Sequence, residues 1–387
     1  MRSFEINATQ VREHDALAAL AVPGACGADS YLWISLTREE FRAQLETVQD
    51  ILQRLCGTQL VDLHVLDLLN EQLPSHYDYT SIYDVLVIRR LATNPASPGA
   101  AAQAPTAAAP GAVPEGLSVL QRIDTRPVGF AVFDRVLLSV HPEDGTVRDA
   151  YAAKLLAAGT PGTATVPSPP SAPDGRLASK RLPSGPADLM LRLVNQIVDG
   201  YLELRREMTR QIDHWQAELI DVKSRFSNWG ALMQARQSLH KLDEICEDQR
   251  GAVQDWIDAL ETLPTPDDPA GRRERELVMI RSRDVYEHIE RVLHHVRRLE
   301  QNAETAVQMH FSVQSHRTND IMRVLTVLTA VFLPLNLIAG IFGMNFEFIP
   351  LVHKADGFWI AMGAMGVTAV VLVVVFWRKR YLARTAR

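Results

Sequence analysis

The chain has 387 residues, which is too many for one ordinary core, because domains usually hold ~100 to 200 residues, so two or three structural units are expected. Charged residues make up 22% of the sequence and hydrophobic residues 47%, which excludes a wholly disordered chain. The formal net charge of -6 gives no global reason to expect nucleic acid as a partner. Cys26, Cys56 and Cys246 lack CxxC spacing, which argues against a disulfide framework or a thiolate zinc site and favours a reducing compartment.

The first 186 residues carry strand and helix signals in turn, and they predict a cytoplasmic α/β domain. Residues 30–36 and 81–91 are rich in β-formers and predict strands. Residues 37–55 predict a helix that Thr37 caps with Glu40 three residues later, and a second helix is expected near residues 61–73. Strand character returns at residues 128–142.

Two stretches interrupt this pattern. Residues 92–115 and 159–186 are dominated by Ala, Pro, Gly and Ser, which bury too little apolar surface to offset the entropy of ordering. We therefore expect disordered insertions there, the first between two adjacent strands and the second at the end of the domain. No apolar run follows Arg2, so no secretory signal is expected, and the soluble part should stay in the cytoplasm.

Residues 187–320 are rich in helix formers and predict a helical stalk, with one strong break at residues 264–271. After that break, apolar and small residues recur in steps of three and four, as in a coiled-coil seam. The seam comprises Val278, Ser282, Val285, Ile289, Val292, Val296, Leu299, Ala303, Ala306, His310 and Val313. No breaker lies between Arg272 and Leu333, so one helix of ~100 Å can run from the stalk into the first apolar segment, and its seam offers a means of assembly.

Two apolar segments near the end of the sequence predict transmembrane helices, at residues 321–346 and 357–377. Residues 347–356 form the short outer loop between them, and residues 378–387 form a basic tail. Basic residues precede the first span and follow the second, so both termini are expected to be cytoplasmic by the positive-inside rule.

Signatures of catalysis are missing from the sequence. It contains no GxxxxGK[ST] phosphate loop, no GxGxxG after a strand, no HExxH and no GxSxG, so we do not expect an enzyme. His288, His294 and His295 lie on the long helix, but their spacing does not make a tetrahedral zinc site, and we interpret them as part of a solvated face.

Polar and helix-disturbing residues occur inside the first span, at Thr326, Thr329, Pro334 and Asn336, and these should face protein or a wet lumen. One helical face of the span comprises Met322, Leu325, Thr329, Leu333, Asn336 and Gly340, with Asn319 at its cytoplasmic mouth. One helix cannot enclose a pore, whereas several copies around an axis can. A packing face without a lumen remains the alternative.

The outer end of this span reads Gly343-Met344-Asn345, within GIFGMNFE at residues 340–347. Together with residues 319–350 and with SRDVYEHIERVLHHVRRLE at residues 282–300, this resembles the CorA family of magnesium channels. Residues 66–91 are a weaker match to the cytoplasmic domain of that family. The resemblance implies a funnel-shaped homopentamer in the bacterial inner membrane, in which the first span lines a pore for passive influx of divalent cations, chiefly Mg²⁺ with Co²⁺ or Ni²⁺ as further cargo.

The same resemblance implies roles for individual residues. Gly343, Met344 and Asn345 would form the selectivity filter, where neutral amides hold hydrated Mg²⁺ through its water shell. Thr329 and Asn336 would line the pore, while Met322, Leu325 and Leu333 would form apolar collars. Asp67 and Asp284 would bind regulatory Mg²⁺ between subunits, and Glu347 and Asp356 would belong to the outer loop. No nucleotide or organic cofactor is implied.

The sequence departs from the family pattern in its outer loop, where Leu351 replaces a common acidic residue and Lys354 lies close by. Leu66 stands where an acidic residue often precedes the sensing carboxylate. Two alternatives therefore stay open. One is a Zn²⁺ transporter of the same superfamily, and the other is a membrane-anchored sensor or scaffold without a pore.

Overall fold

The structure is a computed structural model that describes residues 1–14, 30–92, 124–159, 182–220, 229–344 and 357–378. The chain divides into two compact units. The first comprises Met1–Trp215 and Phe226–Ala303, and the second comprises Gln216–Arg225 and Glu304–Arg387. Most of the two Ala/Pro-rich stretches, at residues 93–123 and 160–181, falls outside the described residues, so the disorder expected there is not tested.

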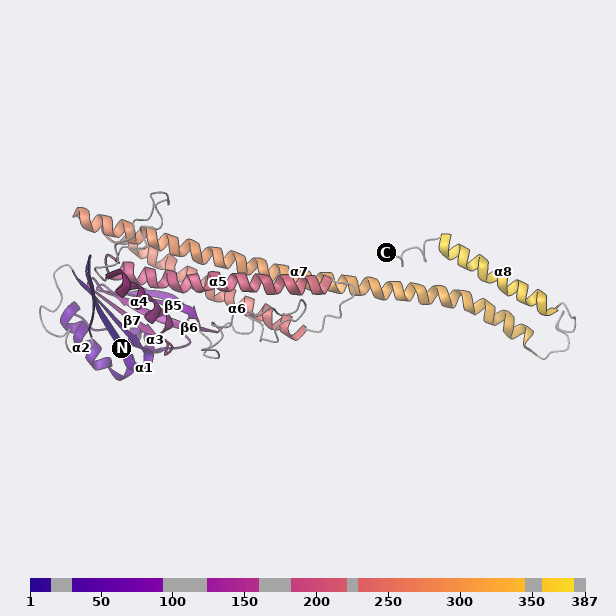
Figure 1. Cartoon of the computed structure of the whole chain (residues 1–387), viewed down its shortest axis with the longest axis horizontal. Helices are drawn as coiled ribbons and strands as arrows, with labels where there is room; N and C mark the ends of the chain where they lie inside the picture. The colour runs from indigo at the N-terminus through magenta and orange to yellow at the C-terminus, as the bar shows by residue number, and fades with distance from the viewer. Residues whose placement is uncertain (15–29, 93–123, 160–181, 221–228, 345–356, 379–387) are drawn as a thin grey trace. The chain divides into compact units, whose positions relative to one another are not determined.

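A seven-stranded mixed sheet organises the first unit, in the order β2-β1-β3-β7-β6-β5-β4 (Figure 1). Its strands are β1 (Arg2–Ile6), β2 (Val11–His14), β3 (Tyr31–Thr37), β4 (His76–Tyr79), β5 (Asp84–Leu91), β6 (Thr125–Val132) and β7 (Val136–His141). Only the central neighbours β3 and β7 run parallel among the described pairs. The strands β5 and β6 pair directly, which confirms that the first insertion lies between adjacent strands.

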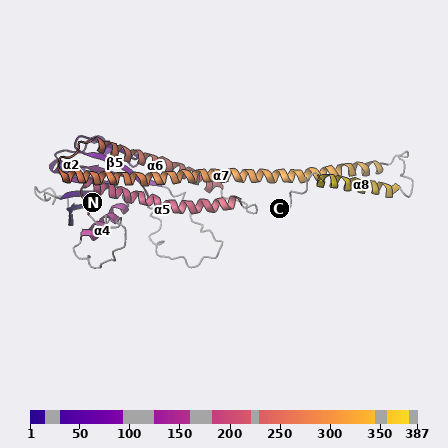
Figure 2. The same cartoon turned by 90° about the horizontal axis from the view of Figure 1, so that it is seen from above.

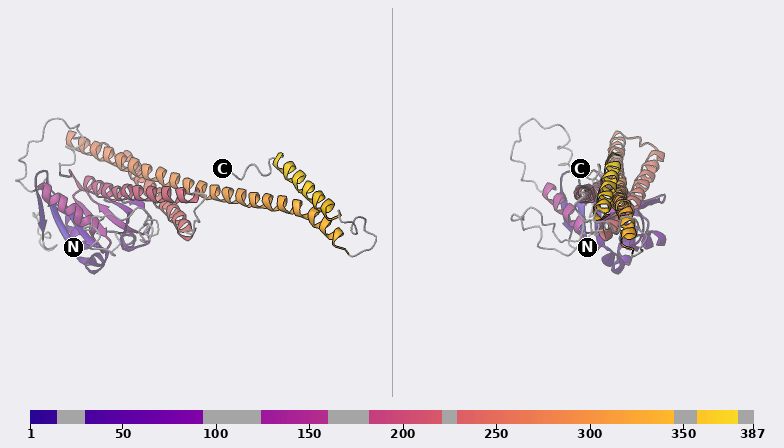
Figure 3. Two further views of the ribbon diagram at one scale, coloured as in Figure 1. Left: turned by 45° about the vertical axis from the view of Figure 1, so that its right-hand side comes forward. Right: turned by 90° about the vertical axis from the view of Figure 1, so that its right-hand side faces the viewer.

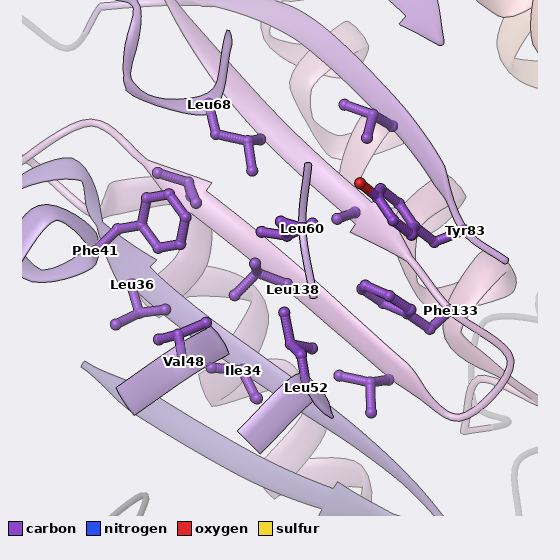
Figure 4. Packing of buried hydrophobic residues seen from close by; sticks show 14 of the residues in the cluster. Ile34, Leu36, Phe41, Val48, Leu52, Leu60, Leu68, Tyr83, Phe133 and Leu138 are labelled. Atoms are coloured by element: carbon purple, nitrogen blue, oxygen red, sulfur yellow. The ribbon is translucent and has the colours of Figure 1, made fainter. Parts of the chain in front are cut away.

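Three helices cover one face of the sheet: α1 (Arg38–Ala43), α2 (Leu45–Cys56) and α3 (Asp62–Leu69). Side chains that alternate along the strands, such as Ile34 and Leu138, pack there against Phe41 and Leu52 (Figure 4). The predicted capping box at Thr37 is confirmed, because the Glu40 N–H donates to the Thr37 hydroxyl and the Thr37 N–H donates to the Glu40 carboxylate.

The single helix expected over residues 37–55 is wrong, because the structure has two helices there. The backbone leaves helical geometry at Gln44, where φ is -115° and ψ is 19°. Neither Gly nor Pro marks this position in the sequence. The break between α1 and α2 therefore arises from how the two helices pack on the sheet.

The opposite face of the sheet lies against α4 (Thr146–Gly159), α5 (Pro186–Ile220) and α6 (Trp229–Thr262). The ring of Trp33 meets Tyr151 of α4 edge to face with 6.1 Å between centroids. The Tyr201 hydroxyl of α5 donates to the Arg89 carbonyl over 2.8 Å, and Tyr77 packs against Trp256 of α6 at 5.8 Å. The first unit is therefore a three-layer arrangement of helices, sheet and helices.

The seam of the long helix α7 (Pro269–Phe342) is buried inside its own chain from Val278 through Ala306. Ser282, the polar member of the seam, is fully buried and accepts a 2.9 Å hydrogen bond from the Trp256 indole N–H. Figure 2 shows α5 and α6 beside this part of α7. The expectation that these residues assemble subunits is therefore wrong, since the seam already packs against helices of the same chain. Helix periodicity alone does not distinguish these two partners.

The second unit contains the rest of α7 and α8 (Gly357–Arg378) (Figure 3). At 74 residues α7 is ~110 Å long, which confirms a helix that continues from the stalk into the first apolar segment. By length and composition, α7 and α8 are the two described helices that are apolar enough to cross a membrane.

Candidate functional site

The face of α7 that the sequence singles out is exposed along its whole length. Asn319, Met322, Leu325, Thr329, Leu333, Asn336 and Gly340 all lie on this face and all are exposed. Leu333 keeps 70% of its surface, which is unusual for a leucine in a helix unless lipid or another protein chain covers it. The described part of the chain therefore leaves this face without an intramolecular partner.

Threonine hydroxyls on this segment are directed back to the helix. Thr326 donates to the Met322 carbonyl over 2.7 Å, and Thr329 donates to the Leu325 carbonyl over 2.9 Å. This is the usual way in which a hydroxyl is tolerated in an apolar helix. Because the donor is used internally, each oxygen presents its lone pairs outward, so Thr329 offers an acceptor to water or to a hydrated cation.

A proline interrupts the hydrogen-bond ladder of the same segment. Pro334 lies inside α7 and has no N–H to donate to the Ala330 carbonyl. Within an apolar environment such a carbonyl needs another donor, such as water or a neighbouring helix. Pro334 and the exposed Asn336 thus make two consecutive turns polar in a segment that is otherwise suited to lipid.

The helix ends at Phe342, directly before the Gly-Met-Asn tripeptide. The Gly343 N–H still donates to the Ala339 carbonyl over 2.9 Å, and Met344 is exposed. A Cβ added to Gly343 would lie 3.0 Å from the Ala339 oxygen, so a larger residue would require the end of α7 to shift. Asn345, Glu347 and Asp356 lie outside the described residues.

The predicted sensing residue Asp67 lies on α3, with its side chain 21% exposed. Its Oδ2 is 3.9 Å from Nε2 of His76 on the neighbouring strand β4. Nδ1 of His76 lies 3.3 Å from the Pro74 carbonyl, so Nε2 is the ring nitrogen that faces Asp67. Leu63 and Leu66 are strongly exposed on the same helix.

The second predicted sensing residue, Asp284 on α7, has the same kind of neighbour. Its side chain is 59% exposed and lies 3.6 Å from Nε2 of His288, one helical turn later. Nδ1 of His288 lies 3.0 Å from the side-chain amide of Asn195, so Nε2 is again the ring nitrogen that faces the carboxylate. His288 is therefore not simply part of a solvated face.

Each of these carboxylate–imidazole pairs holds only two potential metal ligands. Within the described residues no three His, Cys, Asp or Glu side chains are grouped so that they could hold a metal. One chain therefore offers incomplete sites, and a complete one requires ligands from water or from a second copy. The sequence analysis missed His76 and His288 in this context. The i,i+4 spacing could have indicated the second, whereas the first depends on β4 lying beside α3.

Comparison with known proteins identifies a matching family and several relatives. Residues 118–380 match the family described as CorA-like Mg2+ transporter protein. The cobalt/magnesium transport protein CorA of Thermotoga maritima is 28% identical over 194 residues, which are 50% of this chain and 52% of that protein. The putative metal ion transporter YfjQ of Bacillus subtilis is 24% identical over 198 residues, 51% of this chain and 59% of the relative. The chain thus spans only about half the length of these curated relatives.

Solved structures share the fold over nearly the whole chain. The complete structure of the CorA magnesium transporter from Methanocaldococcus jannaschii has a TM-score of 0.64 at 15% identity and covers 99% of both chains. A full-length CmaX protein has a TM-score of 0.63 at 19% identity, covering 98% of this chain and 97% of that one. Because the family match extends over well more than half of the sequence, the chain belongs to the family of CorA-like Mg²⁺ transporter proteins.

Proposed function

We propose that this protein is a channel for divalent metal cations, chiefly Mg²⁺, formed by five copies of the chain in a bacterial inner membrane with both termini in the cytoplasm. Its family is one of membrane-bound transport proteins and not of enzymes. In the proposed assembly, the exposed face of α7 lines a central pore, and Gly343, Met344 and Asn345 form the outer filter.

One observation carries this proposal: a polar face within an apolar helix that its own chain leaves uncovered. Thr329 and Asn336 are exposed on a segment with a mean hydropathy of 2.2. Placing these groups in lipid is costly, whereas a water-filled axis satisfies them. Several copies of α7 around an axis provide that environment, with Leu325 and Leu333 as the narrow apolar rings.

The physics of Mg²⁺ suits such a pore. This ion gives up its water reluctantly, so neutral oxygen acceptors that bind the hydrated ion are a better filter than carboxylates that strip it. No nucleotide is needed to drive influx, because a divalent cation gains ~4.6 kcal/mol from an inside-negative potential of 100 mV.

Uptake by liposomes tests the proposal. Asn345→Ala is expected to abolish Mg²⁺ flux while the assembly keeps its size, because the carboxamide at the filter is lost. Asn302→Ala, the same substitution on α7 before the apolar segment, is the matched control and should keep normal flux. Normal flux through Asn345→Ala, or a detergent-solubilised particle of one or two chains, would contradict the channel and support a membrane-anchored scaffold.

We further propose that Asp67 and Asp284 bind a regulatory cation between neighbouring subunits. The exposed leucines beside Asp67 support a protein contact at this surface, because apolar side chains grouped on one face usually dock another chain. A dication that bridges two carboxylates would hold adjacent subunits in a closed arrangement, and its loss would let them separate. Replacing both residues by Ala should weaken Mg²⁺ inhibition and Mg²⁺-dependent protection from protease. Unchanged inhibition would remove this assignment but leave the pore untouched.

A transition metal such as Zn²⁺ or Co²⁺ is the second candidate, and the imidazoles favour it. Both proposed carboxylates have an imidazole nitrogen within 4 Å. Imidazole nitrogen suits Zn²⁺, Co²⁺ and Ni²⁺, whereas Mg²⁺ prefers oxygen. Flux of Mg²⁺ without Zn²⁺ would exclude Zn²⁺ as cargo. If His76→Gln and His288→Gln weaken inhibition by Zn²⁺ but not by Mg²⁺, the transition metal binds at the regulatory site.

A further inference from the structure

Four arginines gather at one end of the sheet, close to where the parallel strands β3 and β7 end. Arg38 directly follows β3, Arg90 lies at the end of β5, Arg126 at the start of β6, and Arg148 in the first turn of α4. Arg38 and Arg90 keep only 5% and 2% of their surface exposed. The end of a sheet where parallel strands finish is a common place for ligands in open α/β folds.

In the β5–β6 register, two of these arginines lie opposite each other. Arg90 and Arg126 are direct cross-strand partners, so their side chains leave the same face of the sheet. Like charges in this position destabilise a sheet. Asp144 forms an ion pair with Arg90, but Arg126 opposite is left on the solvent side. The strand pairing therefore maintains a repulsion that an anion would relieve.

Buried donors in this cluster lack acceptors. Arg38 donates from Nη2 to the Pro127 carbonyl, but its Nε is buried and has no hydrogen-bond partner. The Nε of Arg90 and the Nη1 of Arg148 are likewise buried without a hydrogen bond. A buried N–H of this kind costs free energy unless an acceptor satisfies it. Three such donors come here from three different elements.

The carboxylates near Arg148 do not satisfy all of its N–H donors. Its Nε donates to Asp149 over 2.9 Å, but Asp149 also accepts a bond from Arg2 over 3.3 Å. Glu40 lies 3.7 Å from Nη1, which is within ion-pair range and too far for a hydrogen bond. Asp149 is thus shared between Arg148 and Arg2, and Asp144 is paired with Arg90, so Arg38 and Arg126 have no ion pair among the described residues.

A glycine turn holds Arg148 in place. Gly145 has a φ of 53°, a conformation that L side chains rarely adopt, and its N–H donates to the Pro142 carbonyl over 3.1 Å. A Cβ at this position would lie 2.9 Å from Nη2 of Arg148. A side chain at residue 145 would therefore displace the Arg148 guanidinium, which the glycine leaves in place.

The buried His141 at the end of β7 reports the local potential. Burial is the largest reason why its pKa falls to about 3, and the positive charges of Arg148, Arg90 and Arg38 lower it further. Burial and the neighbouring Arg126 also lower the pKa of Arg90 to about 10. In both shifts the contribution of the neighbouring arginines adds to that of burial.

From the opposed arginines and the unsatisfied guanidinium donors, we infer that this end of the sheet binds a phosphate oxyanion. The planar fork of an arginine matches phosphate oxygens, and several arginines from separate elements form a typical phosphate site. The ligand would bridge Arg38, Arg90 and Arg148 from inside, with Arg126 at its outer rim. It would link β3, β5, β6 and α4 in the first unit. This site is independent of the proposed pore.

Thermal unfolding of the full-length protein in detergent tests the inference. Inorganic phosphate at about ten times its dissociation constant should raise the melting temperature by about 3 °C over chloride at equal ionic strength. In Arg126→Gln this increment should disappear, while the melting temperature in chloride should stay equal or rise because the repulsion with Arg90 is gone. Arg12→Gln, on the exposed strand β2, is the matched control and should keep the increment.

A second ligand separates two sources of the phosphate group. Stabilisation by inorganic phosphate identifies the free ion as sufficient, and stabilisation only by ATP with chelated metal removed identifies the phosphate end of a nucleotide. The inference is overturned if neither ligand exceeds the chloride control, or if Arg126→Gln and Arg90→Gln retain the wild-type increment. Metal flux is not measured in this experiment, so its failure would leave the proposed function unaffected.

Discussion

Two stretches of the same helix, α7, bury their apolar residues in different ways. Between residues 278 and 303 one stripe is buried against the chain itself, as for Val285 at 2% exposure and Val296 at 0%. Beyond residue 320 most large apolar residues of α7 are exposed, and Val327 is the one described residue of this stretch that is buried. The first stretch is completed by folding, whereas the second requires partners that the single chain does not supply.

This difference predicts which property each substitution should change. Changes in the self-covered part should alter the stability of the first unit, and changes in the uncovered part should alter transport. A substitution between residues 278 and 303 that altered transport, or one beyond residue 320 that altered the stability of the first unit, would contradict this division.

The largest expected effect concerns the sheet core. Leu138→Ala should lower the free energy of unfolding by about 2 to 5 kcal/mol, because it leaves a cavity beneath α2 at a fully buried position. Leu333→Ala removes the same atoms from an exposed position, so it should change the unfolding free energy by less than about 0.5 kcal/mol and increase resting ion leak instead. Urea unfolding followed by tryptophan fluorescence, together with liposome leak, measures both.

The next effect depends on pH. Because burial lowers the pKa of His141 to about 3 in the folded chain, the unfolded state takes up a proton between pH 6.5 and 3 that the folded state refuses. Stability should therefore fall by about 1 kcal/mol per pH unit as the pH drops below 6.5. His141→Gln should reduce this slope in urea titrations from pH 7 to pH 4. The exposed control His294→Gln should retain the wild-type slope, and equal slopes for all three would contradict the prediction.

A smaller effect separates the two apolar helices. Thr329→Val should reduce Mg²⁺ flux about fivefold to tenfold, since the outward lone pairs of the hydroxyl are lost while the shape is kept. Thr368→Val in α8 is a matched control, because Thr368 makes the same bond to the Ala364 carbonyl over 2.8 Å. If both variants lose flux equally, α7 is not distinguished from α8 as the pore helix.

The smallest effect is at the start of α1. Thr37→Ala removes the hydroxyl that accepts from the Glu40 N–H, which should cost about 1 kcal/mol of unfolding free energy. Thr58→Ala, at a position without a capping role, should cost less in the same urea titration. Flux should be unchanged in both variants, because the capping box lies in the first unit.

Local signals in the sequence were sufficient for much of the fold. The long helix was predicted because no breaker lies between Arg272 and Leu333, and the strands β3 and β5 because β-formers cluster there. Residues 128–142 were predicted to have β character, but their division into β6 and β7 was not. Strand order was not predictable, since β3 lies beside β7 across about a hundred residues of sequence. The strands β1, β2 and β4 were missed, because these short segments form only by pairing with their neighbours.

For the candidate site, too, some features could be predicted from the sequence and others could not. The polar residues of α7 were readable from the sequence, because polarity inside an apolar run is conspicuous. The partner of the seam was not, since periodicity gives a face and not its neighbour. The His76 contact with Asp67 and the Arg90 pairing with Arg126 both arise from strand placement, which the local sequence does not show.

One feature of the β5–β6 pair has a practical consequence. Leu91 and Thr125 are register partners, and the Ala92 N–H donates to the Asp124 carbonyl over 2.8 Å, so the sheet is already closed where the intervening sequence departs and returns. Doubling the length of a loop costs only ~0.6 kcal/mol of closure entropy. A fluorescent reporter or an epitope tag spliced between these two anchors should thus leave the ladder intact, which makes the hairpin a convenient place to label the protein.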